Sequence, residues 1–166
     1  QTITITVTDV NEAPVITSNG GSPTSVSINE NSTSSVTTVT STDVDGASTA
    51  TYSISGTDAD DFTIDSSTGI LTFSSSPNFE APTDSDADNV YEIIVTVTDN
   101  GSLTDSQTIT VTVTEANEAP VITSNSGGGT ASINHNENIS SVTTVTSTDV
   151  DASASATYSI HGTDVC

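Results

Sequence analysis

The chain repeats itself over a distance of 106 residues, and this repeat constrains its fold more than any other feature. The segment QTITITVTDVNEAP at residues 1–14 recurs as QTITVTVTEANEAP at residues 107–120, and both copies continue as VITSN. The same offset separates two copies of SVTTVTSTDVD, which begin at Ser35 and Ser141. A repeat of this length is the size of a whole domain, so it indicates a tandem array of similar domains.

The printed sequence is out of phase with these domains. We expect residues 1–10 to be the last strand of a preceding repeat and residues 11–117 to be one complete repeat. Residues 118–166 are expected to be the first part of the next repeat. This last segment is too short to bury a full core by itself.

Apolar residues alternate with threonine or other polar residues along much of the chain, which is typical of half-buried strands. The segments with this pattern are 3–7, 36–39, 52–54, 62–64, 70–73, 91–97 and 109–113. The residues from Asp65 to Gly69 predict a hairpin turn in which Gly69 takes a positive φ. No segment has helical periodicity, so the expected fold class is all-β, with tandem Greek-key sandwiches of about seven strands each.

Charge narrows the range of functions further. The chain has 22 Asp and Glu and no Lys or Arg, for a formal net charge of −22. Such a chain offers no basic surface to nucleic acid, and its carboxylates repel one another unless a cation is present. The single cysteine, Cys166, excludes an internal disulfide, and no apolar run is long enough for membrane insertion.

Acidic residues cluster where strands are expected to end. At the end of a sandwich, loops from distant parts of the sequence converge, so these carboxylates would crowd together. Several carboxylates with Asn and backbone oxygens supply the six to eight oxygen ligands that calcium prefers. Calcium is therefore the expected cofactor.

The order of these motifs resembles the cadherin repeat, especially the cadherin-like repeats of large bacterial surface adhesins. The motifs are INEN at 28–31, TDVDG at 42–46, FTIDSSTGILTF at 62–73, NFE at 78–80, VTVTDNG at 95–101 and DVNEAP at 9–14. The resemblance implies a cadherin/Ig-like sandwich with calcium ions held between consecutive repeats. Asn78 stands where the family has Asp, and Glu12 and Glu118 stand where Asp is usual.

The resemblance also implies which residues bind calcium. The first junction would use Asn11, Glu12, Asp43, Asp45 and Asp99. The second junction would use Glu30, Glu80, Asn117, Glu118, Asp149 and Asp151. Asp9 and Glu115 are further candidates in the two linkers. By contrast, Asp84, Asp86 and Asp88 fail the EF-hand pattern, so we expect a solvated acidic loop there.

These features predict an extracellular, cell-surface protein that is a calcium-stiffened extender or fibre segment and mediates adhesion or surface assembly. Its expected partners are adjacent repeats of the same chain, with like chains in a filament or surface glycans as further partners. Two alternatives remain open: a filament subunit whose sandwiches are completed between chains, and a polysaccharide-binding repeat. No group of nucleophile, base and orienting residue stands out, so we expect no enzyme.

Overall fold

A computed structural model of the chain describes residues 1–45, 49–151 and 154–162. The chain divides into two compact units, Gln1–Ala116 and Asn117–Cys166, and each is described by itself. Two residues discussed above, Gly46 of the TDVDG motif and Cys166, lie outside the described residues. The only helical elements in the described part are 3-10 turns, which are η1 (Ser18–Gly21), η2 (Ala59–Asp61) and η3 (Ser124–Ser126).

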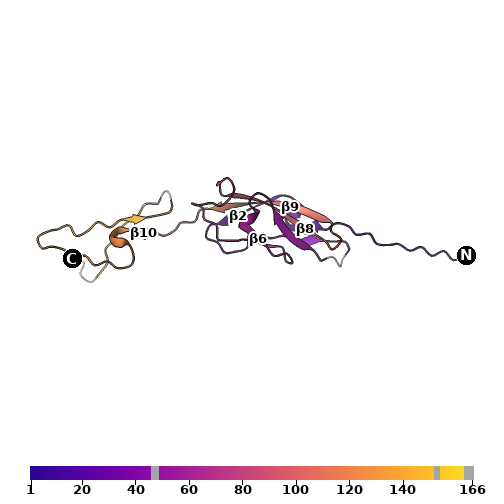
Figure 1. Cartoon of the computed structure of the whole chain (residues 1–166), viewed down its shortest axis with the longest axis horizontal. Helices are drawn as coiled ribbons and strands as arrows, with labels where there is room; N and C mark the ends of the chain where they lie inside the picture. The colour runs from indigo at the N-terminus through magenta and orange to yellow at the C-terminus, as the bar shows by residue number, and fades with distance from the viewer. Residues whose placement is uncertain (46–48, 152–153, 163–166) are drawn as a thin grey trace. The chain divides into compact units, whose positions relative to one another are not determined.

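Two sheets make up most of the first unit, as Figure 1 shows. The four-stranded sheet has the order β2-β9-β8-β5 and contains β2 (Thr24–Asn29), β5 (Thr51–Ser55), β8 (Val90–Thr98) and β9 (Thr104–Thr114). The three-stranded sheet has the order β3-β7-β6 and contains β3 (Thr37–Thr38), β6 (Phe62–Ile64) and β7 (Ile70–Phe73). A separate short pair joins β1 (Val15–Ile16) to β4 (Ser41–Thr42). The all-β expectation is confirmed.

The core of the first unit lies where the inward sides of these strands meet. On β8 the buried residues alternate with outward ones, and Ile93 and Val95 have no exposed surface. On β9 the pattern continues with Ile109 and Val111. Three aromatic rings fill the space beside them, and Phe73 meets Tyr91 edge-on with ring centroids 5.2 Å apart. Because most other side chains are small, a few long strands and three rings supply most of the buried apolar surface.

The expected strands at 52–54, 62–64, 70–73, 91–97 and 109–113 all lie in observed strands. The hairpin turn is also confirmed, since Gly69 has a φ of +69° and its N–H donates to the Asp65 carbonyl. A side chain at Gly69 would collide with the Val39 carbonyl, so glycine is required there for two reasons.

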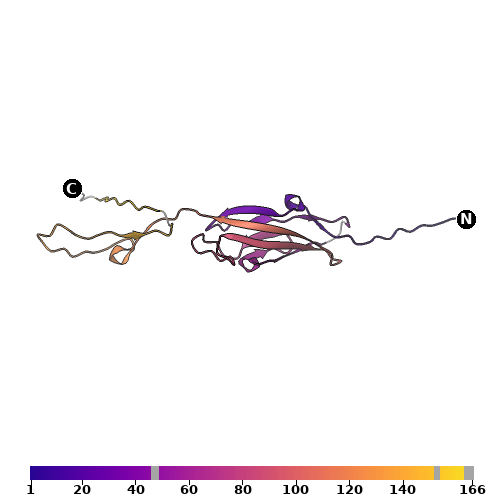
Figure 2. The ribbon, with the colours of Figure 1, turned by 90° about the horizontal axis from the view of Figure 1, so that it is seen from above.

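Several strands differ from the sequence-based expectation, including the short strands β1 and β4, which were not expected. The strand β2 was not expected, and it pairs in parallel with β9, as the strands running side by side in Figure 2 show. No strand is observed at 3–7, where Ile5 is 84% exposed, and the assignment of residues 1–10 to a preceding repeat stays a prediction. The near-identical segment in β9 is a strand because β2 and β8 hydrogen-bond to it on both sides, whereas residues 1–10 have no such neighbours.

The second unit contains one short antiparallel pair, β10 (Val121–Ile122) with β11 (Ser147–Thr148). Most of its apolar side chains are exposed, including Val142 and Ile160. Across the part of the chain that the structure describes, no helix has the length and apolar character needed to cross a membrane.

Candidate metal centre

Five predicted ligands come together at one end of the first unit, and we call them the first acidic pole: Asn11, Glu12, Asp43, Asp45 and Asp99. Asn11 and Glu12 precede β1, the two aspartates Asp43 and Asp45 follow β4, and Asp99 directly follows β8. Because β1 pairs with β4, the start of β1 and the end of β4 lie at the same end of the unit. Three segments that are distant in sequence thus bring their oxygens to one end of the sandwich.

Hydrogen bonds join the members of the first acidic pole. The backbone N–H of Glu12 donates to Asp45 Oδ2 at 2.9 Å, and the N–H of Asp45 donates to Asp43 Oδ1 at 2.9 Å. The side-chain amide of Asn11 donates to Asp99 Oδ2 at 2.7 Å. These contacts hold the acidic groups together without any positively charged side chain.

Asp99 is the best-supported carboxylate of the first acidic pole and is only 6% exposed. Its burial alone would raise its pKa, but hydrogen bonds from the Asn11 amide and from backbone N–H groups outweigh burial and hold the pKa of Asp99 below its usual value. One of these donors is the N–H of Leu103, which lies 2.7 Å from Asp99 Oδ1. Asp99 is therefore ready to act as an anion in the folded state.

The pKa of Glu12 is shifted in the opposite direction to that of Asp99. A hydrogen bond with the Asp45 side chain raises the pKa of Glu12, and burial and the negative charges of Asp45, Asp9 and Asp43 raise it further. The first acidic pole thus carries more negative charge than its own donors can balance. A cation bound there would offset the repulsion between these carboxylates.

One buried carboxylate oxygen of the first acidic pole lacks a hydrogen-bond partner. Asp43 Oδ2 is buried and accepts no hydrogen bond, although a buried carboxylate oxygen normally has a partner. Carboxylate oxygens, the Asn11 amide oxygen and backbone carbonyls are the hard ligands that calcium takes, so the residues present fit this ion.

The second unit repeats this arrangement with Asn117, Glu118, Asp149 and Asp151, which we call the second acidic pole. The N–H of Glu118 donates to Asp151 Oδ2 at 3.0 Å, and the N–H of Asp151 donates to Asp149 Oδ1 at 3.2 Å. Asp151 is only 9% exposed, and its buried Oδ1 accepts no hydrogen bond. The buried oxygen without a partner is thus a feature of both poles.

Glu30 and Glu80 lie at the other end of the first unit, near the end of β9. Glu30 is 3% exposed, and its two oxygens accept the N–H groups of Phe79 at 3.0 Å and Ala116 at 2.9 Å. A carboxylate has four lone-pair sites, so Glu30 retains capacity for a cation. Glu80 is exposed, and the Asn78 side chain caps the N–H of Ala81 at 3.0 Å.

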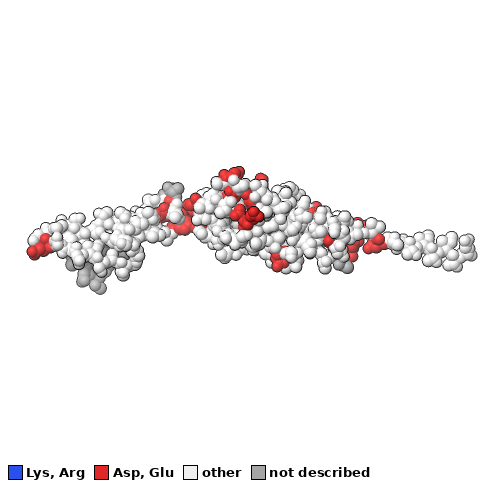
Figure 3. Space-filling model, viewed as in Figure 1, with Lys and Arg blue, Asp and Glu red and all other residues white. Residues whose placement is uncertain are grey.

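The two weaker candidates are both exposed. Asp9 lies close enough to Glu12 to raise its pKa, so it belongs to the surroundings of the first acidic pole. Glu115 lies just beyond β9. Figure 3 shows that the carboxylates in view gather in separate groups with uncharged surface between them.

A further acidic cluster lies in the loop before β8. Carboxylate oxygens of Asp84, Asp86 and Asp88 lie within 4.8 Å of one another, and the charge of Asp88, ahead of burial and the contact with Asp84, raises the pKa of Asp86. Asp84 is only 5% exposed, so the expectation of a fully solvated loop was wrong for this residue. Backbone N–H groups of Asp88 and Asn89 donate to its two oxygens, and this local bonding accounts for its burial.

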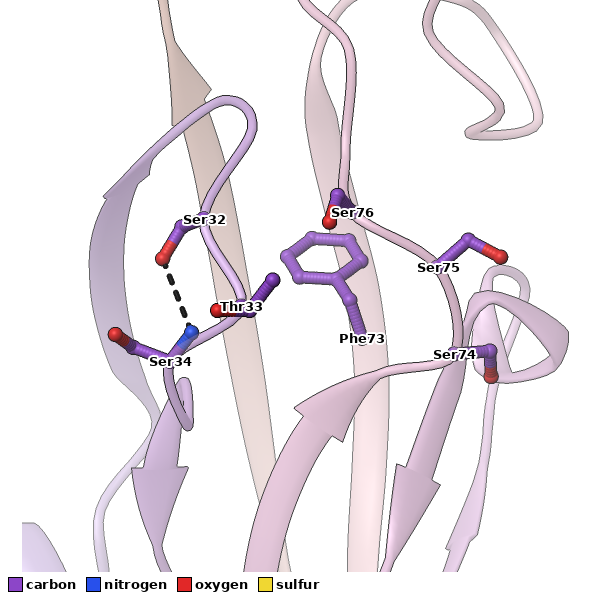
Figure 4. A pocket seen from close by; sticks show the side chains of 7 residues that line it. All are labelled: Ser32, Thr33, Ser34, Phe73, Ser74, Ser75 and Ser76. Atoms are coloured by element: carbon purple, nitrogen blue, oxygen red, sulfur yellow. Dashed lines mark hydrogen bonds between the residues drawn. The ribbon is translucent and has the colours of Figure 1, made fainter.

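The polysaccharide alternative depends on aromatic surface, and one hollow in the first unit has an aromatic wall. It measures about 200 Å³, and Figure 4 shows Phe73 between Ser32–Ser34 and Ser74–Ser76. The Phe73 ring also packs on Phe62, with centroids 4.3 Å apart, so it belongs to the aromatic core rather than forming a free platform.

The first unit is a two-sheet sandwich with acidic residues at its ends. Comparison with known families shows which family has this architecture. A family model described as Cadherin domain matches residues 24–114, which is more than half of the chain. The chain therefore belongs to the cadherin family. Cadherin domains are non-catalytic adhesion modules that bind calcium and are typically extracellular.

Solved structures support the same fold. Human protocadherin-24 EC1-2 is 21% identical with a TM-score of 0.54, and the match covers 84% of this chain and 61% of that one. A second crystal form of the same protein is 25% identical with a TM-score of 0.54, covering 86% and 63%. Protocadherin gammaB7 EC3-6 is 23% identical with a TM-score of 0.56, covering 75% and 30%. The chain thus spans about three-fifths of the protocadherin-24 structure, and a comparison with curated proteins found no match.

Sequence reasoning also missed two polar side chains that hold the segment 16–22, which follows the first acidic pole in the sequence. One is Gln107, which is 1% exposed and donates to the carbonyls of Ser18 at 3.0 Å and Ser22 at 2.6 Å. The other is Asp105, whose Oδ2 accepts the N–H of Ile16 at 2.8 Å. The only sign of either residue's role in the sequence was its place at the start of a segment whose alternate side chains point inward.

Proposed function

We propose that the chain is a segment of an extracellular array of cadherin repeats that calcium stiffens, acting as a structural extender or fibre segment in adhesion or surface assembly. In this array residues 1–10 close one repeat, residues 11–117 form the next, and residues 118–166 open a third. Cell-surface adhesins built from many such repeats are the kind of protein that the sequence motifs resemble.

The observation that carries this proposal is the buried carboxylate oxygen without a hydrogen-bond partner in each acidic pole, on Asp43 and on Asp151. In a chain with no Lys or Arg, only an external cation can balance such groups. Bound calcium would supply that positive charge and shared coordination.

The chain's own residues account for the stiffening. Asn11 and Glu12, or Asn117 and Glu118, lie on the linker, whereas the paired aspartates lie on the sandwich that follows. Ligands from both parts would fix the angle of the linker once they share an ion. The buried Pro14 already restricts the backbone beside the first acidic pole.

The ligand set proposed for the second junction adds Glu30 and Glu80 from the preceding repeat to the second acidic pole. Glu115 in the linker is a further candidate. With Asn78 in place of Asp and its side chain capping Ala81, we expect this residue to contribute no charge.

Small-angle scattering on a chain of at least two complete repeats tests the proposal. Calcium at about 1 mM, the range for extracellular modules, is expected to lengthen and stiffen the particle. Replacing Asp149 and Asp151 together by Ala should remove the effect at that junction while the complete repeat stays folded. Asp60→Ala, at an exposed acidic residue away from the poles, is the matched control. Calcium binding without any change of shape would contradict the extender function.

One alternative has its own supporting observation. Ile3 and Val7 are 76% and 90% exposed, and the second unit has a hollow of about 260 Å³ lined in part by Ile122, Ile133 and Val145. In a filament, residues 1–10 of one chain would contribute one strand to the second unit of another, and further strands would still be needed to complete that sandwich. Native mass spectrometry distinguishes the two, because a filament of this kind would dissociate into many short chains rather than one long one.

A glycan partner remains the other alternative for the array. Pull-down on immobilised polysaccharides at constant calcium concentration tests it, and retention that the same polysaccharide in solution competes away would favour it over the extender function.

A further inference from the structure

The turn between β8 and β9 contains an Asn–Gly pair, Asn100–Gly101, directly after the buried Asp99. Asn100 and Gly101 are both exposed. Gly101 has no side chain, and its backbone N–H is hydrogen-bonded to the Asp99 carboxylate, so this nitrogen becomes free to react only when the turn, which lies outside both strands, opens. The amide carbon of the Asn100 side chain and the Gly101 nitrogen are joined by only a few bonds, so they can meet whenever the turn opens.

This arrangement supports a known type of spontaneous amide chemistry. When the Gly101 nitrogen loses its proton to a water-derived base and attacks the Asn100 side-chain carbon, an N–C bond forms and the bond to the side-chain nitrogen breaks. That nitrogen leaves as ammonia, and a five-membered cyclic imide remains. Water then opens the imide at either carbonyl and gives aspartate or isoaspartate, with no oxidant or reductant involved.

The position of this turn gives the reaction a consequence. A Cβ added at Gly101 would lie 2.6 Å from Asn11 Nδ2, so the Gly101 backbone already packs tightly on the Asn11 side chain. The same Asn11 amide donates to Asp99. Any change of backbone length between residues 100 and 101 must therefore disturb the Asn11–Asp99 contact.

We propose that Asn100 is a site of spontaneous covalent modification, at which attack by the Gly101 nitrogen releases ammonia and leaves aspartate or isoaspartate within the first acidic pole. The aspartate form adds a carboxylate beside Asp99 and strengthens calcium binding. The isoaspartate form adds one carbon to the backbone, displaces Gly101 against Asn11 and weakens it. The covalent step does not require calcium, whereas its effect on calcium binding rests on the proposed function.

The chain offers a matched second site for comparison. Asn19–Gly20 is also an exposed Asn–Gly pair, but a Cβ at Gly20 would meet nothing within 4 Å. This pair lies in η1 and away from the acidic pole. Conversion at Asn19 should therefore leave calcium binding unchanged, and calcium should slow conversion at Asn100 alone, because ions held by Asp99 and Asn11 keep that turn closed.

Mass mapping of the aged, folded chain tests the proposal. The chain is held in calcium-free buffer at mildly alkaline pH, checked for native circular dichroism, and cut with a protease specific for acidic residues. The fragment containing Asn100 is expected to gain the mass difference between NH2 and OH, and Asn100→Gln should abolish the gain there while Asn19 still converts. Conversion at Asn19 with none at Asn100 would overturn the proposal.

Two further measurements separate the covalent step from its consequence. Asn100→Asp, which copies one product, should bind calcium more tightly by about fivefold at most, the effect of one charge about 8 Å from a divalent cation in water. Asn19→Asp is the control and should bind as the unchanged chain does. If Asn100 converts but neither form binds calcium, the proposed function fails and the modification stands. If the chain binds calcium but conversion proceeds equally with and without it, the link between the turn and the pole is wrong.

Discussion

Residues 11–45 and their counterparts 117–151, one repeat later, have similar sequences but very different burial. Ile16 in β1 is 1% exposed, whereas Ile122, its counterpart in β10, is 48% exposed. The strand pairs that contain them are otherwise the same, since Ile16 pairs with Ser41 and Ile122 pairs with Ser147. The difference is caused by β9, which packs against β1 in the first unit.

The hydrogen bonds between the linker glutamate and the aspartates, by contrast, are nearly the same in the two acidic poles. The N–H of Glu12 donates to Asp45 at 2.9 Å, and the N–H of Glu118 donates to Asp151 at 3.0 Å. Even the link from Ser41 to Tyr52 at 2.9 Å has a counterpart from Ser147 to Tyr158 at 2.8 Å. The contacts between the linker glutamate and the aspartate pair of each pole are thus encoded locally, 33 residues apart, whereas Asp99 and the hydrophobic core come from more distant parts of the repeat.

The largest expected effect comes from truncating the two equivalent isoleucines. Ile16→Ala should lower the free energy of unfolding by about 2–5 kcal/mol, because it leaves a cavity in a packed core. Ile122→Ala should change it by no more than about 0.5 kcal/mol, because this side chain is half exposed. Urea unfolding monitored by circular dichroism measures both. Equal losses would mean that the second unit has a core like that of the first.

The two equivalent glutamines give a second contrast. Gln107→Ala should cost about 2 kcal/mol, because two backbone carbonyls lose their donor and a buried polar pocket loses its side chain. Gln1→Ala should have no measurable effect, since Gln1 is exposed. Thermal unfolding of both variants under one condition provides the measurement. A stable Gln107→Ala variant would show that η1 is held by other contacts.

Calcium affinity tests whether the poles are as similar as their hydrogen bonds suggest. Asp45→Asn and Asp151→Asn each keep an oxygen for the N–H of the linker glutamate but remove one charge. Each should weaken calcium binding at its own pole by about tenfold, because ligand charge strongly affects affinity. Calorimetry on the single and double variants can resolve the two contributions. If calcium affinity fell at one pole only, this would contradict the view that the same local sequence builds both poles.

Acid stability should differ between the units by a smaller amount. Because the pKa of Asp99 is lowered from an ordinary value of 3.8, its contribution to stability is present above that value and is lost as pH falls through the lower folded-state pKa. Asp99→Asn should therefore flatten the acid limb of the stability curve of the first unit. The printed sequence contains no counterpart of Asp99 for the second acidic pole. Urea midpoints measured at a series of acidic pH values would show this, and an unchanged slope would argue against the assigned hydrogen bonds.

Much of this fold could be predicted from local patterns. The alternation at 91–97 and 109–113 indicated β8 and β9, and the DSSTG turn indicated the β6–β7 hairpin. Acidic clusters were expected near strand ends, and the resemblance to the cadherin repeat implied which residues of the two poles bind calcium. Each of these features depends on a few consecutive residues.

The features that were missed depend on contacts between distant segments. The segment 24–29 alternates only weakly, with Val26 and Ile28 as its apolar positions, and it becomes β2 because β9 offers a parallel partner. Asp84 is buried because backbone N–H groups of its own loop satisfy it, which composition alone does not show. The strand expected at 3–7 fails for the opposite reason, since a correct pattern has no neighbouring strand to pair with.

The central claim is that the acidic poles bind calcium, and calorimetric titration of this chain with calcium tests it most directly. We expect saturable binding with a dissociation constant of about 0.1–1 mM, more than one ion per chain, and loss of this binding when Asp45 and Asp151 are both replaced by Asn. No binding heat at several times that concentration, or binding that survives the double replacement, would contradict the claim.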